Sequence, residues 1–291
     1  MSPPVAMRDF FRSGRLYSPA LSLALVVPAL AILFLAFILP LLTLLHESLL
    51  VPAFTTVHYQ RVFDDPVYVR VMWRTLRVAF YVTVLSLLLG YPLAYLMARS
   101  TGLKLALLAM CVMLPLWTSV LVRTYAWTVL LQRNGIVNQM LQRVGLTDAP
   151  LGMLYTEGAV VLAMAHVLLP FMILPIYSAL RGIPDDYRRA AMMLGANPVR
   201  TFIEVIWPLS LPGVASGALM VFLLSLGFFV TPALIGGPRQ MMIATLVSQQ
   251  VRELLNWPFA GALVGCLLVL VLALTLAFSR FLRLDRFVAS R

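Results

Sequence analysis

Charged residues are scarce in this sequence. Asp, Glu, Lys and Arg together make up 11% of its 291 residues, whereas hydrophobic residues make up 62% and the mean hydropathy is +0.94. A soluble domain carries about 25% charged residues, and a soluble fold of this length cannot bury so much apolar surface. Disordered chains are poor in apolar residues. The composition therefore excludes a soluble globule and a disordered chain, and it indicates a membrane protein.

Cysteine and lysine are almost absent. Cys111 and Cys266 both lie inside apolar runs, so we expect packing residues rather than a disulfide framework or a zinc site. Lys104 is the only lysine among 22 basic residues, and the net charge is +11. This charge could indicate nucleic-acid binding, but the arginines stand singly or in pairs between long uncharged runs, as they do at the ends of membrane helices. We therefore expect contact with a lipid bilayer and none with nucleic acid.

Six runs without charged residues are long enough to cross a bilayer. A spanning helix needs about 20 apolar residues because the hydrocarbon core is about 30 Å thick. The fifth run exceeds one span and carries turn signals at Pro208, Pro212 and 236–238, so we expect one helix within it, at about 212–230. The sequence thus predicts an all-α polytopic membrane protein with six transmembrane helices, in the runs 16–45, 78–98, 105–122, 158–180, 205–238 and 254–279.

The arginines also predict the orientation of the chain. The first run is too long for the apolar core of a cleaved signal peptide, so we expect it to remain as the first span. With the N-terminus in the cytoplasm, most basic residues fall on the cytoplasmic side, and both termini are then cytoplasmic. We therefore divide the chain into a cytoplasmic segment 1–18, a six-helix domain 19–281 and a cytoplasmic tail 282–291.

Two longer connections are expected on the outer side. The first is 46–77, which is read as a connection between spans. The second, 123–157, contains a turn signal at Asn134–Gly135 and then a short amphipathic stretch. We predict an interfacial helix at 136–144 in this second connection.

The cytoplasmic loop 181–208 is too polar to span and is patterned as two short helices. Asp185 is a good N-cap for the first helix, and Asp186 suits the positive end of its dipole. Gly195 supplies a left-handed stop. One face of this helix holds residues spaced three or four apart: Tyr187, Ala190, Ala191 and Leu194.

A second short helix is predicted directly after this stop. Asn197 is a good cap, and Pro198 suits the first helical position. We expect the helix to end at about residue 206, after which Pro208 and Pro212 begin the fifth span. The loop therefore predicts a helix–turn–helix that ends beside the span it joins.

This loop resembles the EAA loop of membrane permease subunits of bacterial ABC importers. That pattern is Glu-Ala-Ala, three residues, Gly, nine residues, an apolar residue, any residue, Leu and Pro. Arg189 stands in place of the Glu and Trp207 in place of the Leu, so a salt bridge attributed to that Glu does not carry over. The matching positions are Ala190, Ala191, Gly195, Val205 and Pro208.

Four further segments resemble the spermidine/putrescine-type branch of these permeases, and its first permease subunit: 121–131, 134–135, 169–177 and 229–239. The resemblance implies a MetI-like transmembrane fold in the bacterial inner membrane. It also implies a second, homologous permease subunit, two copies of a cytoplasmic ATPase that uses ATP and Mg, and an external solute-binding protein. This chain would bind no cofactor, and its ATPase-coupling residues would be Asp185, Tyr187, Arg189, Ala190, Ala191, Leu194, Gly195, Pro198 and Pro208.

The implied substrate is a polyamine or a related small organic ion. None of the six runs contains an acidic residue, so either selectivity lies in the binding protein or the substrate is not cationic. The alternatives are an ABC importer permease for an amino-acid-like, phosphonate or inorganic ion substrate, and an ion-coupled secondary transporter. An ion-coupled carrier places ionisable residues inside its spans, and only His166 does so here.

Intrinsic catalysis is not expected. His46, His58 and His166 share no ligand spacing, and the sequence has no HExxH or GxSxG motif and no paired carboxylates at membrane depth. A Walker A motif is also absent, so the chain cannot be its own ATPase. We predict neither a catalytic nor a metal site.

Aromatic and arginine residues near the outer ends of the spans are candidates for the translocation path or for an outer contact. An aromatic belt and snorkelling arginines explain them more simply, although the rings could also make cation–π contacts with a polyamine. For His166 a helix–helix hydrogen bond is favoured over a proton relay. Pro170 and Pro175 are either gating hinges or kinks that set packing. The outer candidates are Trp117, Arg123, Tyr125, Trp127, Phe228 and Phe229.

Overall fold

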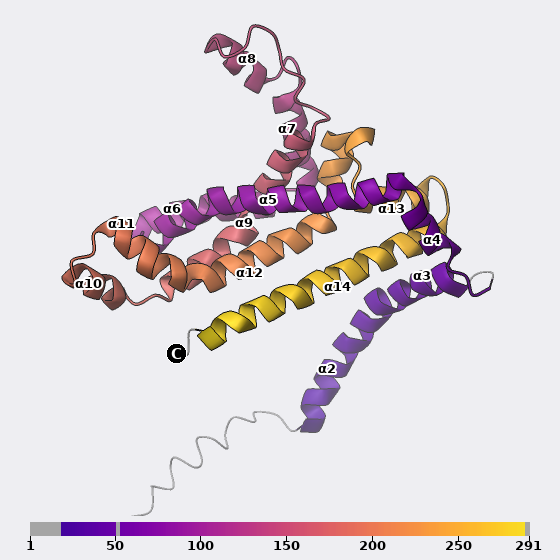
Figure 1. The fold of residues 1–291 in the computed structure, drawn as a ribbon, viewed down its shortest axis with the longest axis horizontal. Helices are drawn as coiled ribbons and strands as arrows, with labels where there is room; N and C mark the ends of the chain where they lie inside the picture. The colour runs from indigo at the N-terminus through magenta and orange to yellow at the C-terminus, as the bar shows by residue number, and fades with distance from the viewer. Residues whose placement is uncertain (1–18, 51–52, 289–291) are drawn as a thin grey trace, which may run out of the picture.

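The computed structural model of the chain describes residues 19–50 and 53–288 (Figure 1). Every regular element in these residues is helical, which confirms the predicted all-α class. The predicted segment 1–18 and the end of the predicted tail lie outside the described residues. In chain order the elements are α2 (Pro19–Leu33), the π-helix η1 (Phe34–Ile38), α3 (Leu39–Leu50), α4 (Val57–Asp64), α5 (Pro66–Ala98), α6 (Gly102–Trp117), α7 (Val120–Leu131), α8 (Ile136–Arg143), α9 (Glu157–Arg181), α10 (Asp185–Met193), α11 (Pro198–Thr201), the π-helix η2 (Phe202–Ile206), α12 (Trp207–Leu226), the π-helix η3 (Pro232–Gly236), the 3₁₀-helix η4 (Pro238–Gln240), α13 (Ile243–Arg252) and α14 (Trp257–Val288).

Five helical stretches of the described residues are long and apolar enough to cross a membrane. Each overlaps one of the uncharged runs, so five of the six predicted spans are confirmed. A sixth crossing exists if a bent helix pair counts as one span. A short helix is present within the stretch predicted as an interfacial helix at 136–144, as α8. The five stretches are Val26–Leu50, Pro66–Ala98, Glu157–Arg181, Pro198–Leu226 and Trp257–Phe278.

The outer connection predicted at 46–77 is largely helical instead. α5 begins at Pro66, where Oδ1 of Asp65 accepts a hydrogen bond from the Val67 N–H at 2.9 Å and the proline occupies the start of the helix. The first turns of α5 carry arginines, and a search for uncharged runs therefore cuts the helix short. The same connection contains α4.

The prediction of a single helix at 105–122 is wrong. α6 ends at Trp117, and the chain resumes as α7 after a bend of 100°. At the break, the Thr118 hydroxyl donates to the Pro115 carbonyl at 2.9 Å and Thr118 itself is extended. Thr118 and Ser119 both leave the helical conformation, so the apolar run contains a corner.

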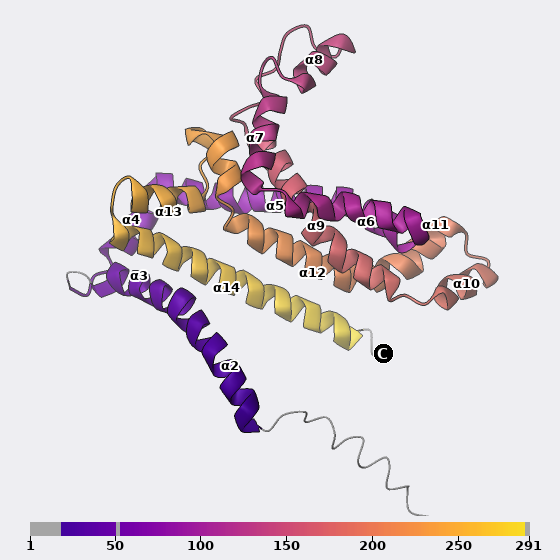
Figure 2. The ribbon, with the colours of Figure 1, turned by 180° about the vertical axis from the view of Figure 1, so that it is seen from behind.

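The main core lies where α5, α9 and α12 pack together (Figures 1 and 2). Met172 of α9 is fully buried there, and glycines let the neighbouring helices approach it. A Cβ added to Gly90 of α5 would lie 3.2 Å from the Met172 side chain, and one added to Gly217 of α12 would lie 3.0 Å from the Met172 carbonyl oxygen. α9 is therefore the central helix of the bundle.

A second core joins α14 to α4, α13 and the start of α5, and α3 packs along α14 beside it. Tyr68 and Phe259 meet edge to face there, with ring centroids 4.9 Å apart.

α2 diverges from the rest of the bundle in both views, and side chains 26–40 are exposed (Figures 1 and 2). Of the cysteines predicted to be packing residues, Cys266 is half-buried, but Cys111 is exposed on α6 because that helix buries little of its surface.

Candidate functional site

Residues 185–206, here called the lever, protrude at one end of the bundle (Figure 1). The first lever helix, α10, starts one residue earlier than predicted, at Asp185. Pro184, not Asp185, is the N-cap, and its ring offers no capping oxygen. Asp185 and Asp186 instead occupy the first turn, where their carboxylates still face the positive end of the helix dipole.

The turn of the lever has the predicted geometry. Gly195 has φ = 86°, in the left-handed region that glycine adopts without strain. Its N–H donates to the Met192 carbonyl and the Ala196 N–H to the Ala191 carbonyl, both at 3.0 Å, which completes a Schellman cap. Asn197 then caps the next helix, because its Oδ1 accepts from the Arg200 N–H at 2.8 Å.

The sequence predicted that the second lever helix ends at about residue 206, before the fifth span. This prediction is wrong. The helix continues without a break through η2 into α12. The Trp207 N–H donates to the Phe202 carbonyl, five residues back, so Pro208, which has no N–H, follows without ending the helix. The second lever helix and the fifth span therefore form one helical stretch, Pro198–Leu226.

Four aromatic residues, here called the aromatic clamp, hold the base of the lever against α5. Phe202 meets Tyr91 and Tyr95 edge to face, with centroids 5.9 and 5.4 Å apart, and Trp207 lies 5.0 Å from Tyr91. The Tyr91 hydroxyl is 2.9 Å from that of Ser210. Sequence reasoning missed this cluster, although Trp207 in place of the pattern's Leu was a signal of unusual packing.

The tip of the lever is apolar and uncovered. No residue of α10 is buried, and Met193 and Leu194 are each 89% exposed. On the predicted face, Tyr187 and Ala190 are exposed and Ala191 is half-buried. Arg189, which replaces the Glu of the EAA pattern, is exposed and forms no ion pair with the described residues.

At the other end of the bundle, the structure brings part of the predicted outer group together. Trp127 Nε1–H of α7 donates to His166 Nδ1 of α9 at 3.2 Å, which confirms the predicted helix–helix hydrogen bond. Two nitrogens of Arg123 are buried and have no hydrogen-bond partner among the described residues. In contrast, Trp117 and Tyr125 are 88% and 70% exposed and join no such cluster.

The remaining predicted residues lie within α9 or just after α12. Phe228 and Phe229 are half-buried just beyond α12. Pro170 and Pro175 lie inside α9, which stays helical over its full length. The carbonyl of Pro175 lies only 2.7 Å from where a Cβ on Gly213 would be, so this part of α9 is in tight contact with α12.

Together, a multi-pass helical bundle and a helix–turn–helix continuous with one span define a membrane permease subunit of the ABC importer class. The chain belongs to the family of binding-protein-dependent transport system inner membrane components, whose sequence profile matches residues 4–288. It is 36% identical over 222 residues to the spermidine/putrescine transport system permease protein PotB of Haemophilus influenzae, a match that covers 76% of this chain and 77% of the relative. The predicted MetI-like, multi-pass inner membrane permease is thereby confirmed.

Solved structures show the same fold. A bacterial ABC transporter that imports the acidic polysaccharide alginate matches with a TM-score of 0.71 at 18% identity, covering 96% of this chain and 99% of that chain. An alginate ABC transporter in complex with an alginate pentasaccharide-bound periplasmic protein matches with a TM-score of 0.70 at 20% identity, covering 93% and 94%. At such identities the likeness concerns the fold alone.

Proposed function

We propose that this chain is the first permease subunit of an ATP-driven importer for a polyamine such as spermidine or putrescine, or a related small organic ion. The observation that carries the proposal is the 36% identity to a spermidine/putrescine permease over three quarters of both chains. In this assembly the chain forms half of the translocation path, and a second, homologous permease forms the other half. An external binding protein delivers the solute, as the periplasmic protein in complex with the alginate transporter suggests by analogy.

Two copies of a cytoplasmic ATPase supply the energy, with their own ATP and Mg, and this chain is not itself catalytic. The uncovered apolar tip of the lever is the surface that enters a groove of one ATPase. Closure of the ATPase pair then moves the lever, and the unbroken helix from Pro198 to Leu226 passes the movement to the span. With this arrangement both termini and the lever are cytoplasmic.

Selectivity is assigned mainly to the binding protein. The predicted runs contain no acidic residue that would hold a polyamine, and Arg123 at the outer end would repel one. The path therefore binds the solute weakly and releases it readily. Five aromatic residues are proposed as path or outer-contact residues: Trp117, Tyr125, Trp127, Phe228 and Phe229. Pro170 and Pro175 are proposed as hinges of α9.

The test is uptake by the complete complex in proteoliposomes, with the binding protein and labelled spermidine or putrescine. We expect uptake that needs ATP inside the vesicles and that is unaffected by collapse of the proton gradient. Uptake that follows the proton gradient without ATP would contradict the ATP-driven importer. ATP-dependent uptake of a different solute, identified by mass spectrometry of the ligand released from the binding protein, would contradict only the polyamine assignment.

A further inference from the structure

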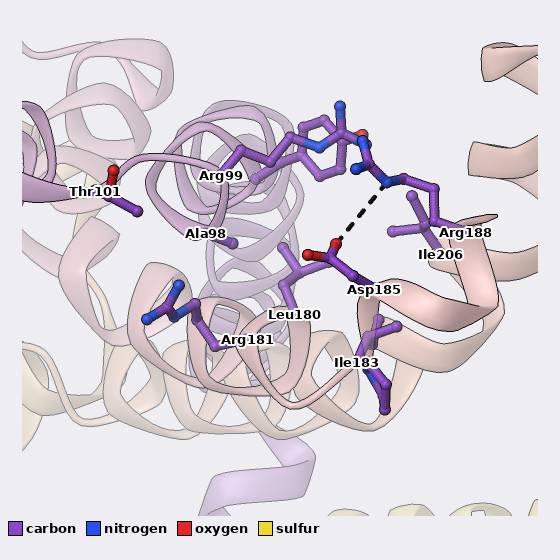
Figure 3. A pocket seen from close by; sticks show the side chains of 11 residues that line it. Ala98, Arg99, Thr101, Leu180, Arg181, Ile183, Asp185, Arg188 and Ile206 are labelled. Carbon is purple, nitrogen blue, oxygen red and sulfur yellow. Dashed lines mark ion pairs between the residues drawn. The ribbon is translucent and has the colours of Figure 1, made fainter.

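A cavity of about 550 Å³ opens between the lever and the ends of two spans (Figure 3). Its walls come from the end of α5, the connection to α6, the end of α9, the start of α10 and η2. Neither solute passage nor ATPase docking, as proposed above, gives this cavity a role. Its polar side chains belong to Arg99, Thr101, Arg181, Asp185 and Arg188, with Tyr95 beside them.

The cavity contains more positive than negative charge. Three arginines and one carboxylate line it, and the Arg188 Nε lies 3.8 Å from Asp185 Oδ1, which is too far for a hydrogen bond. The Arg181 side chain points away from this pair (Figure 3). That Nε is buried and has no hydrogen-bond partner among the described residues. No described carboxylate pairs with Arg99 or Arg181. In Figure 3 the side chains of Arg99 and Arg188 extend toward one another, an arrangement that an anion between them would stabilise.

Two helices begin at the wall of the same cavity. Thr101 is the N-cap of α6, and Pro184 is the N-cap of α10; neither side chain caps its helix by a hydrogen bond. The N–H groups of a first helical turn and the helix dipole both favour a bound anion. Tyr95 holds the Arg99 guanidinium 4.4 Å from its ring centroid, which fixes one of the three cations in place.

We propose that this cavity binds the phosphate group of an anionic phospholipid. Arg99 directly follows α5 and Arg181 is the last residue of α9, so both lie where these spans meet the lipid headgroups. Leu180, Ile183 and Ile206 form an apolar wall that suits the glycerol and the first carbons of an acyl chain. A free phosphate would supply the same charge but would leave this wall without a partner.

A headgroup bound here connects the lever to the bundle. It bridges Arg188 of α10 to Arg99 after the end of α5, while Arg181 at the end of α9 and Ile206 of η2 line the same cavity. The lipid therefore favours the lever position in which Arg99 and Arg188 approach one another. The proposal rests on the position of the spans in the bilayer and not on the identity of the transported solute.

The test is lipid binding to the purified, delipidated complex, followed by native mass spectrometry with phosphatidylglycerol or phosphatidylcholine. We expect phosphatidylglycerol to remain bound in preference to phosphatidylcholine. The double variant Arg99→Gln/Arg188→Gln removes two charge-assisted contacts and is expected to weaken this binding about tenfold or more. Arg143→Gln/Arg252→Gln removes the same charge from exposed positions at the ends of α8 and α13, which do not line the cavity; it is the matched control and should bind as the wild type does.

Several results would overturn the proposal. Equal retention of the two lipids, or equal weakening in both double variants, would show that no specific anionic lipid site exists. Binding of inorganic phosphate without retention of phosphatidylglycerol would assign the cavity to a free anion. If the double variant fails to assemble, a photo-crosslinking side chain at Ile183 in the otherwise unchanged complex gives the answer. Captured phosphatidylglycerol supports the site, and capture of no lipid, or of phosphatidylcholine equally, rejects it.

Discussion

At the scale of single residues, glycine decides how closely the central helices approach. Gly213 of α12 faces the backbone of α9 at Pro175 and Ile176, and a Cβ built on it would lie 2.5 Å from the Ala179 Cβ. Real Cβ atoms do not pass so near, so any side chain at this position must push the two helices apart. In contrast, Gly227, at the end of the same helix, has open space around its Cβ position and an ordinary negative φ.

Gly213→Ala is therefore expected to destabilise the complex by about 1–3 kcal/mol, the usual cost of overpacking a tight core. The measurement is the unfolding midpoint of the purified complex in detergent. Gly227→Ala is the matched control, and it should be neutral or slightly stabilising because alanine restricts the unfolded chain more than glycine does. If the two variants unfold at the same midpoint, α9 and α12 do not pack tightly at Gly213.

At the scale of elements, the lever depends on a left-handed glycine at its turn. Gly195→Pro should abolish solute uptake, because proline fixes φ near −65° and cannot replace the observed 86°. The tip would then reorient, and the ATPase should no longer copurify. Gly145→Pro is the control, since Gly145 also has a positive φ (74°), follows the short helix α8 and is surrounded by open space. Retained copurification with Gly195→Pro would refute the docking role.

The aromatic clamp makes a different prediction for the base of the lever. Phe202→Ala removes the ring that contacts Tyr91 and Tyr95, so the lever should still dock but transmit less movement. We expect ATPase copurification to be unchanged and the number of solutes imported per ATP hydrolysed to fall several-fold. Ile203→Ala changes the exposed neighbouring residue and should leave this ratio unaltered. An unchanged ratio in Phe202→Ala would mean that the clamp only supports folding.

The sequence predicted the elements that depend on local chemistry. The glycine stop, the Asn197 cap and five of the spans follow from residue type and spacing, and each is found. The clamp was missed because it pairs Tyr91 with residues more than a hundred positions later, and a single sequence contains no signal for such contacts. The corner between α6 and α7 was missed for a related reason: the buried Thr124–Thr231 hydroxyl pair, at 3.0 Å, ties α7 to the start of the distant helix η3.

At the scale of the whole molecule, the bent pair α6–α7 is either a broken span or a loop that re-enters on the same side. Two observations decide between them. α6 begins on the lever side, because Thr101 and Arg188 line one cavity. α9 ends on the lever side at Arg181 and crosses the bundle, so its start at Glu157 lies on the opposite side. The chain between 101 and 157 must therefore change sides, and α6–α7 is a broken span.

Single cysteines can test this topology in a Cys111→Ala/Cys266→Ala background with a membrane-impermeant maleimide. Leu103, Ala149 and Met193 are exposed and lie, in turn, at the start of α6, before α9 and on the lever. We expect Ala149→Cys to react from the outside of spheroplasts, and Leu103→Cys and Met193→Cys only after the membrane is opened, because the arginine bias places the lever in the cytoplasm. A re-entrant pair would instead give Leu103→Cys and Ala149→Cys the same accessibility. Reversed labelling of all three would preserve the broken span and contradict only the orientation.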